Sequence, residues 1–136
     1  MFTLFYAGAL ALLGLFLAYK TTSTRMSSET FLGTGDSFEM LQATRAHGNL
    51  VEYALFFLIL SALLESVGQI SNLATGIFGD VFLLARLSHA YGITRPEATS
   101  KFRVAGTALT WLVLLVQSLW ALKISFVWLL ANNFGF

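Results

Sequence analysis

The sequence has no cysteine, a single proline, two histidines and few charged residues. The absence of cysteine excludes disulfide bonds, thiolate metal sites and a cysteine nucleophile, and it leaves the redox compartment undetermined. The two histidines, His47 and His89, are too few for a histidine-rich metal site, so we expect no metal. Charged residues make up 11% of the chain, against roughly 25% in an ordinary globular protein, which is too little for a soluble surface.

The charge balance also argues against nucleic acid as a partner. The formal net charge is +1 over 136 residues, whereas phosphate binding requires a concentrated excess of lysine and arginine on one face. The length suits one domain, and we expect residues 1–136 to form it.

Hydrophobic residues make up 57% of the chain and gather in four stretches, each near the ~20 residues that cross ~30 Å of hydrocarbon. The predicted helices span about residues 2–20, 38–65, 72–92 and 103–130. The first stretch could be a signal peptide, but no basic residue precedes it and no small-residue cleavage site follows it, so we favour a retained helix. Because the connections are short, we predict an all-α membrane protein, an antiparallel bundle of four transmembrane helices without an internal repeat.

Local signals indicate where these helices begin and end. Asp36 or Ser37 is a candidate N-cap for the second helix, with Glu39 in the first turn, where the helix dipole favours an anion. Lys20 ends the first apolar run, so the residues from there to Asp36 are expected to form a polar loop. The only proline, Pro96, disfavours helical conformation at the residue before it, which predicts a break after the third helix.

The positive charges predict the orientation in the membrane. The first and third connections contain Lys20, Arg25, Arg95 and Lys101, with Arg103 at the edge. The opposite side has only Lys123 near the tail and Glu65 in a short turn. By the positive-inside rule, the first and third connections face the cytoplasm, and both termini are non-cytoplasmic.

The densest polar cluster is RAHGNLVEY, residues 45–53, at the start of the second apolar run. At about 100° per residue, Arg45, Asn49, Glu52 and Tyr53 fall on one stripe of a helix, whereas His47 points elsewhere and has no assigned role. Ionisable groups at membrane depth are costly unless they face protein or water. The stripe must therefore look inward or across a contact between subunits.

The third predicted helix offers partners for this stripe. Arg86 and His89 lie three residues apart on one side, and antiparallel packing brings them and Arg103 to the depth of the stripe. Two interpretations stay open. Arg45 with Glu52, or Glu52 with Arg86, could form buried ion pairs that only fix helix register. Alternatively, the local surplus of arginine binds an anion, such as a carboxylate or phosphate of a ligand.

The run RAHGNLVEY, the later ARLSHAYG at residues 85–92 and a following arginine together resemble the MAPEG family, membrane-associated proteins in eicosanoid and glutathione metabolism. The order Arg, three residues, Asn, two residues, Glu, Tyr matches the second-helix signature of that family. The similarity covers nearly the whole chain and is greatest to the small bacterial members. It implies a four-helix bundle assembled as a homotrimer in a bacterial inner membrane, with glutathione sites between subunits near the cytoplasmic side.

The resemblance also implies roles for individual residues. The positions that match glutathione-binding residues of the family are Arg45, Asn49, Glu52, Tyr53, Arg86, His89 and, in the first connection, Arg25. Glutathione has two carboxylates and one ammonium, so the arginines suit the former and Glu52 suits the latter. Arg103 best matches the arginine that stabilises the thiolate of glutathione, and Lys101 competes for the same match. A guanidinium near a thiol favours its anion.

The function implied is that of a glutathione-dependent transferase or peroxidase. It would act on lipophilic electrophiles or lipid hydroperoxides that arrive from the bilayer, with glutathione as co-substrate and no metal. The sequence departs from the family pattern at Ile93 and His89, where many members have tyrosine, and it lacks a proline after Tyr53. Two alternatives stay open: a non-catalytic member that binds lipid or acts as a scaffold, and a small transporter, which the lack of an inverted repeat disfavours.

Overall fold

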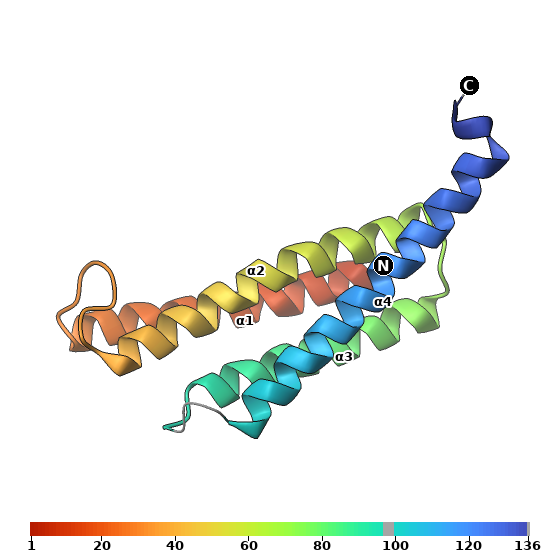
Figure 1. Ribbon diagram of the computed structural model, residues 1–136. Helices are drawn as coiled ribbons and strands as arrows, with labels where there is room; N and C mark the ends of the chain where they lie inside the picture. The colour runs from red at the N-terminus through yellow and green to blue at the C-terminus, as the bar shows by residue number, and fades with distance from the viewer. Residues whose placement is uncertain (97–99, 136) are drawn as a thin grey trace.

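The computed structural model describes residues 1–96 and 100–135 and contains four long helices (Figure 1). They are α1 (Phe2–Ser27), α2 (Phe38–Ser66), α3 (Asn72–Ile93) and α4 (Lys101–Ala131), followed by the short 3₁₀ helix η1 (Asn133–Gly135). No strand occurs within those two residue ranges. Consecutive helices run in opposite directions (Figure 1). The predicted all-α antiparallel bundle is confirmed.

Three of the helices, α1, α2 and α4, are long and apolar enough to cross a membrane by length and composition. The third helix, α3, is shorter at 22 residues, contains Asp80, Arg86 and His89, and is not among these candidate spans. Arg86 and His89 are buried within the bundle. The outer surface is rich in exposed Leu, Phe, Val and Trp side chains, as expected for helices that face lipid.

Serine side chains cap three of the four helices. Ser37, Ser71 and Ser100 each accept, through Oγ, a hydrogen bond from a backbone amide in the first turn of the next helix, at 3.1, 3.2 and 3.2 Å. Each bond satisfies one of the amides that have no partner within the helix. Ser37 is one of the two residues that the sequence offered as an N-cap, and Glu39 lies in the first turn of α2.

The first helix is longer than the sequence predicted. The apolar run ends at Lys20, but residues 21–27 are helical rather than part of a polar loop. The hydroxyls of Thr21 and Thr24 each donate a hydrogen bond to the carbonyl four residues earlier, at 2.9 Å. No glycine or proline interrupts this segment. The loss of hydrophobicity therefore indicates where the helix leaves the apolar layer, while the helix itself continues.

The break in helical structure that Pro96 predicts after the third helix is confirmed. The helix ends at Ile93, and Pro96 lies outside any helix. Residues 97–99 of the predicted connection lie outside the described residues. The next helix, α4, begins at Lys101, ahead of the expected start near residue 103, because Ser100 caps it.

The bundle consists of two helix pairs, α1 with α2 and α3 with α4, which make the most extensive contacts (Figure 1). Gly106 lets α3 and α4 approach closely: a Cβ there would lie 2.5 Å from the carbonyl oxygen of Ala85 and 2.6 Å from the amide nitrogen of His89. Such distances are far inside van der Waals contact, so no larger residue fits without moving the backbone. The pair α3–α4 is therefore packed backbone against backbone.

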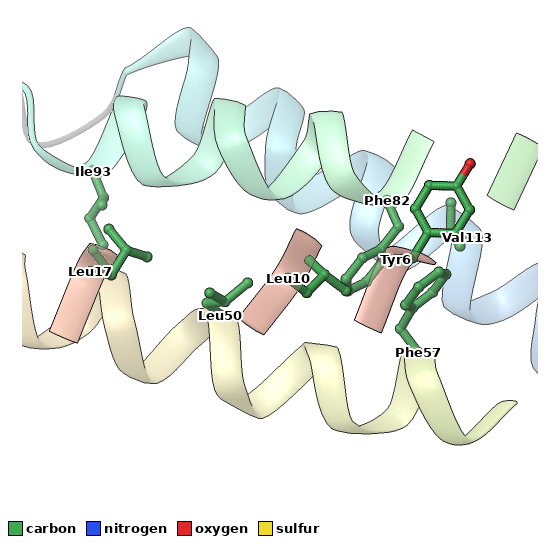
Figure 2. Close-up of a cluster of buried hydrophobic side chains, with 9 residues drawn as sticks. Tyr6, Leu10, Leu17, Leu50, Phe57, Phe82, Ile93 and Val113 are labelled. Carbon is green, nitrogen blue, oxygen red and sulfur yellow. The ribbon is translucent and has the colours of Figure 1, made fainter. Parts of the chain in front are cut away.

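The two pairs are joined by an apolar core and by a polar contact of Tyr6. Figure 2 shows buried side chains from all four helices meeting, and the rings of Phe57 on α2 and Phe82 on α3 stack with centroids 3.9 Å apart. The ring of Tyr6 occupies the space above Gly79, where a Cβ would lie 1.9 Å from it. Its hydroxyl lies 2.7 Å from Oδ1 of Asp80, to which it can donate.

Hydrogen bonds to charged side chains also stabilise the two ends of the α1–α2 pair. The Glu65 carboxylate accepts hydrogen bonds from the amides of Phe2 and Thr3, each at 3.0 Å, and contacts the Met1 ammonium. A carboxylate at this position also complements the dipole of α1. At the opposite end, Nη1 of Arg25 donates to a carbonyl of the α1–α2 connection, that of Gly33, at 2.9 Å.

Candidate functional site

The centre of the predicted site is Arg86, whose side chain is only 1% exposed. Its guanidinium joins three helices. Nη2 donates to Oδ1 of Asn49 on α2 at 2.6 Å, and Nη1 lies 3.2 Å from Oγ1 of Thr110 on α4. Nη2 also lies 3.3 Å from Nδ1 of His89, one turn along α3. The structure thus brings together three of the predicted site residues, Asn49, Arg86 and His89.

The partners of Arg86 are neutral. Within residues 1–96 and 100–135, no carboxylate forms a salt bridge with Arg86, and its buried Nε has no hydrogen-bond partner. A buried charge is costly unless it is paired and fully hydrogen-bonded. The guanidinium of Arg86 therefore has no carboxylate within salt-bridge distance in the described part of the chain.

The contact with Arg86 defines the hydrogen-bonding state of His89. A guanidinium has only donors, so Nδ1 of His89 must be the acceptor in the 3.3 Å contact. The imidazole is then neutral, with its proton on Nε2. His89 is 3% exposed and therefore belongs to the interior of the bundle.

Tyr53 links the arginine to the fourth helix. Its ring lies under the guanidinium of Arg86, with Cζ 5.5 Å from the ring centroid, within the range of a cation–π contact. Nε1 of Trp111 on α4 donates a hydrogen bond to the Tyr53 hydroxyl oxygen at 2.9 Å. Because the indole only donates, the phenolic proton of Tyr53 remains free to be donated elsewhere.

Arg45 and Glu52, the other two residues of the predicted stripe, lie on the outside. Nη1 of Arg45 is 3.8 Å from Oε1 of Glu52, and each side chain is 56% exposed. The expectation of a buried ion pair is therefore wrong for the chain as described: the Arg45–Glu52 pair is exposed, and Glu52 forms no salt bridge with Arg86 in the described residues. Exposed pairs of this kind contribute little to stability. Both charges are available for contact with another molecule.

The remaining predicted site residues lie at the same end of the bundle. Arg103 and Lys101 are exposed in the first turn of α4. The backbone of Arg103 packs on α3, since a Cβ on Gly92 would lie 2.2 Å from its amide nitrogen. Arg25 is half-buried and binds carbonyls of the α1–α2 connection, so its described contacts are with the loop and not with the Arg86 cluster.

Two residues of this cluster, Thr110 and Trp111, were not predicted. Both lie on α4, two turns after Arg103, and contact Arg86 and Tyr53 respectively. Their spacing of seven and eight residues from Arg103 places all three near one face of the helix, which is the signal that could have found them. Within the described residues, no group of three or more His, Cys, Asp or Glu side chains could hold a metal ion.

An antiparallel bundle of long apolar helices, with a polar cluster buried among three of them, defines a multi-pass integral membrane protein. Residues 3–123 match the model of the MAPEG family, and the chain belongs to that family. It is similar to "Inner membrane protein YecN" of Escherichia coli strain K12 and to the protein of the same name in Escherichia coli O6:H1. Each is 32% identical over 119 residues, which cover 88% of both chains. No solved structure matches.

Proposed function

We propose that this protein is a glutathione-dependent enzyme of the bacterial inner membrane, a transferase or peroxidase for lipophilic substrates. The observation that carries the proposal is the buried guanidinium of Arg86, which has neutral partners and lies on the same end of the bundle as the exposed Arg45–Glu52 pair. Such a cluster is suited to a ligand with anionic and cationic groups. Membership of the MAPEG family supports the choice of glutathione.

The chemistry of glutathione fits the charges of the site. Its two carboxylates suit Arg45 and a second arginine, either Arg86 or Arg25, and its ammonium suits Glu52. Tyr53 can donate its phenolic proton to the ligand because its oxygen already accepts from Trp111. In a homotrimer, the exposed Arg45–Glu52 face of α2 would meet a neighbouring subunit, which completes the site and excludes water from it.

Arg103 is the residue proposed to stabilise the thiolate. A thiol with a pKa of ~8.5 is mostly protonated at neutral pH, and a nearby guanidinium favours the anion. In the transfer reaction the thiol loses its proton, the sulfur forms a bond to the electrophilic carbon, and the leaving group departs with the bonding electrons. In the peroxidase reaction two glutathione molecules form a disulfide, while a lipid hydroperoxide becomes an alcohol and water. The nucleophile comes from the ligand, in keeping with a chain that has no cysteine.

The experiment is calorimetry of glutathione binding to the detergent-purified protein, together with turnover of an aryl halide and of a lipid hydroperoxide. We expect binding to the native protein and its loss in Arg45→Ala and in Glu52→Ala, both of which remove exposed side chains. Lys123→Ala, an exposed cation near the opposite end of α4, is the matched control and should bind normally. A native protein that neither binds glutathione nor turns over any substrate would refute the proposal.

A non-catalytic role in lipid binding is the second candidate. The hydrogen bonds from Arg86 to Asn49 on α2 and Thr110 on α4 favour this alternative. They explain why an arginine is buried here even if no ligand binds. Under this alternative, ligand binding persists in Arg103→Ala and the native protein shows no turnover with any substrate. The enzyme proposal predicts the opposite, a native turnover that Arg103→Ala reduces.

A further inference from the structure

A cavity of about 460 Å³ lies away from the Arg86 cluster, between α1, α2 and the residues that follow α3. It falls within the size range of roughly 300–1,000 Å³ that is typical of small-molecule sites. Leu17 on α1 and Ala46 on α2 line it, and both are almost fully buried. The inner part of the cavity is therefore apolar.

The cavity lies at the level where the apolar part of the chain ends. Lys20, which lines it, is the first charged residue of α1 after the uncharged run that starts at Phe2. Glu39, which also lines it, belongs to the first turn of α2. In a bilayer, the ends of the apolar stretches lie at the headgroup layer. A lipid whose tails face the bundle can thus place its headgroup in this cavity.

Lys20 and Glu39 give the cavity one charge of each sign. Both side chains are exposed, and neither forms a salt bridge with any residue in the ranges 1–96 and 100–135. An ammonium donor and a carboxylate acceptor in one cavity match a ligand that has one anion and one cation.

The neutral groups in the wall are biased toward accepting hydrogen bonds. The hydroxyls of Thr24 and Thr94 donate to backbone carbonyls of their own chain segments, at 2.9 and 3.0 Å. The side-chain amide of Gln42 donates to a backbone carbonyl beyond α3 at 2.7 Å. The three side-chain oxygens remain as acceptors, whereas only the second N–H of Gln42 remains as a donor. The wall therefore favours a cation with several N–H donors.

We propose that this cavity binds the headgroup of an ethanolamine phospholipid, with the phosphodiester on Lys20 and the primary ammonium on Glu39. A choline headgroup has the same charges but no N–H donor for the acceptor oxygens, and a glycerol headgroup has no cation for Glu39. Glutathione would bring two carboxylates to a cavity with a single lysine. The site is separate from the proposed thiol site and does not depend on it.

The test uses the full chain in nanodiscs of phosphatidylcholine that contain a minor fraction of phosphatidylethanolamine or of phosphatidylglycerol. Lipids retained after transfer to mild detergent are counted by native mass spectrometry. We expect the native protein to retain phosphatidylethanolamine selectively. Lys20→Gln and Glu39→Gln should each reduce retention by about tenfold, the loss of one charge-assisted hydrogen bond near the surface.

Control variants separate the site from general effects of charge. Lys123→Gln and Glu29→Gln remove exposed charges that do not line the cavity, and retention should remain native. By contrast, Ala43→Leu fills the cavity from the side of α2 and should reduce retention at least as much as the two charge variants. Unchanged melting temperatures will show that the variants are folded.

Four outcomes overturn the proposal. Two concern selectivity: equal retention of choline and ethanolamine lipids, and retention that survives both Lys20→Gln and Glu39→Gln. The other two concern the ligand: binding of free glycerophosphoethanolamine without binding of the lipid, and displacement of the lipid by glutathione alone. Displacement by glutathione would identify this cavity as a glutathione site. Loss of glutathione binding in Arg45→Ala with normal lipid retention would support both proposals as independent sites.

Discussion

The guanidinium of Arg86 on α3 donates to the side-chain oxygen of Asn49 on α2 at 2.6 Å, in the interior of the bundle. This bond connects the α1–α2 pair with the α3–α4 pair at the level of the candidate site. It couples the stability of the bundle to the geometry of that site, because the same arginine is proposed to meet the ligand.

Asn49→Ala should destabilise the protein. The substitution removes the acceptor of a buried charged donor, which costs about 1.5–3 kcal/mol. Thermal or denaturant unfolding in a fixed detergent will measure the loss. Asn132→Ala is the control, since Asn132 is exposed after α4 and its side chain donates to the nearby carbonyl of Trp128. Equal free energies of unfolding for the two variants would show that the hydrogen bond from Arg86 to Asn49 does not stabilise the protein.

Gly106→Ala should weaken the packing of α3 against α4. The added methyl group would lie within 2.6 Å of two backbone atoms of α3, and overpacking of this kind costs roughly 1–3 kcal/mol. Gly8→Ala on α1 is a matched control, because a Cβ there meets nothing within 4 Å. It should raise stability by up to about 1 kcal/mol through helix propensity alone. The prediction is wrong if both substitutions change the free energy of unfolding in the same direction.

The hydrogen bond between Tyr53 and Trp111 can be measured by a double-mutant cycle. We expect Tyr53→Phe and Trp111→Phe to have a coupling energy of about 0.5–1.5 kcal/mol, the usual net value of a neutral hydrogen bond. Trp128→Phe replaces another exposed indole of α4 and should show no coupling to Tyr53→Phe. A coupling near zero for Trp111 would mean that the 2.9 Å contact contributes nothing to stability.

Arg103 and Lys101 should differ in their effect on turnover. If Arg103 stabilises the thiolate, Arg103→Ala lowers kcat by roughly 10²-fold with little change in glutathione affinity, because the lost interaction favours the charged form of the sulfur. The ultraviolet absorbance of bound thiolate at neutral pH should disappear in the same variant. Lys101→Ala should leave kcat and the thiolate absorbance unchanged. The reverse pattern would assign this role to Lys101.

The helix ends and the polar stripe were predictable because their causes are local. Ser37 caps α2 through an amide three residues away, and Pro96 acts on its immediate neighbour. The extension of α1 beyond Lys20 was missed because a charged residue interrupts an apolar run without interrupting a helix. Periodicity placed Asn49 and Glu52 on one stripe, but only packing decides that the first contacts Arg86 while the second stays exposed.

The contributions of α4 could not be obtained from periodicity alone. Thr110 and Trp111 join the site because α3 and α4 touch at Gly106, and this distance depends on both helices at once. The roles of Arg25, Arg45, Glu52 and Arg103 toward glutathione stay predictions, since they depend on a ligand and on neighbouring subunits.

The close packing at Gly92 and Gly106 has a mechanical consequence. Because their backbones are in contact at two levels, we expect α3 and α4 to resist sliding past each other and to move together. The α1–α2 pair is held at its far end by Glu65 on the start of α1. A change in the spacing of the two pairs would then stretch the hydrogen bond between Asn49 and Arg86, so we expect ligand binding at the proposed site to change how readily the bundle opens.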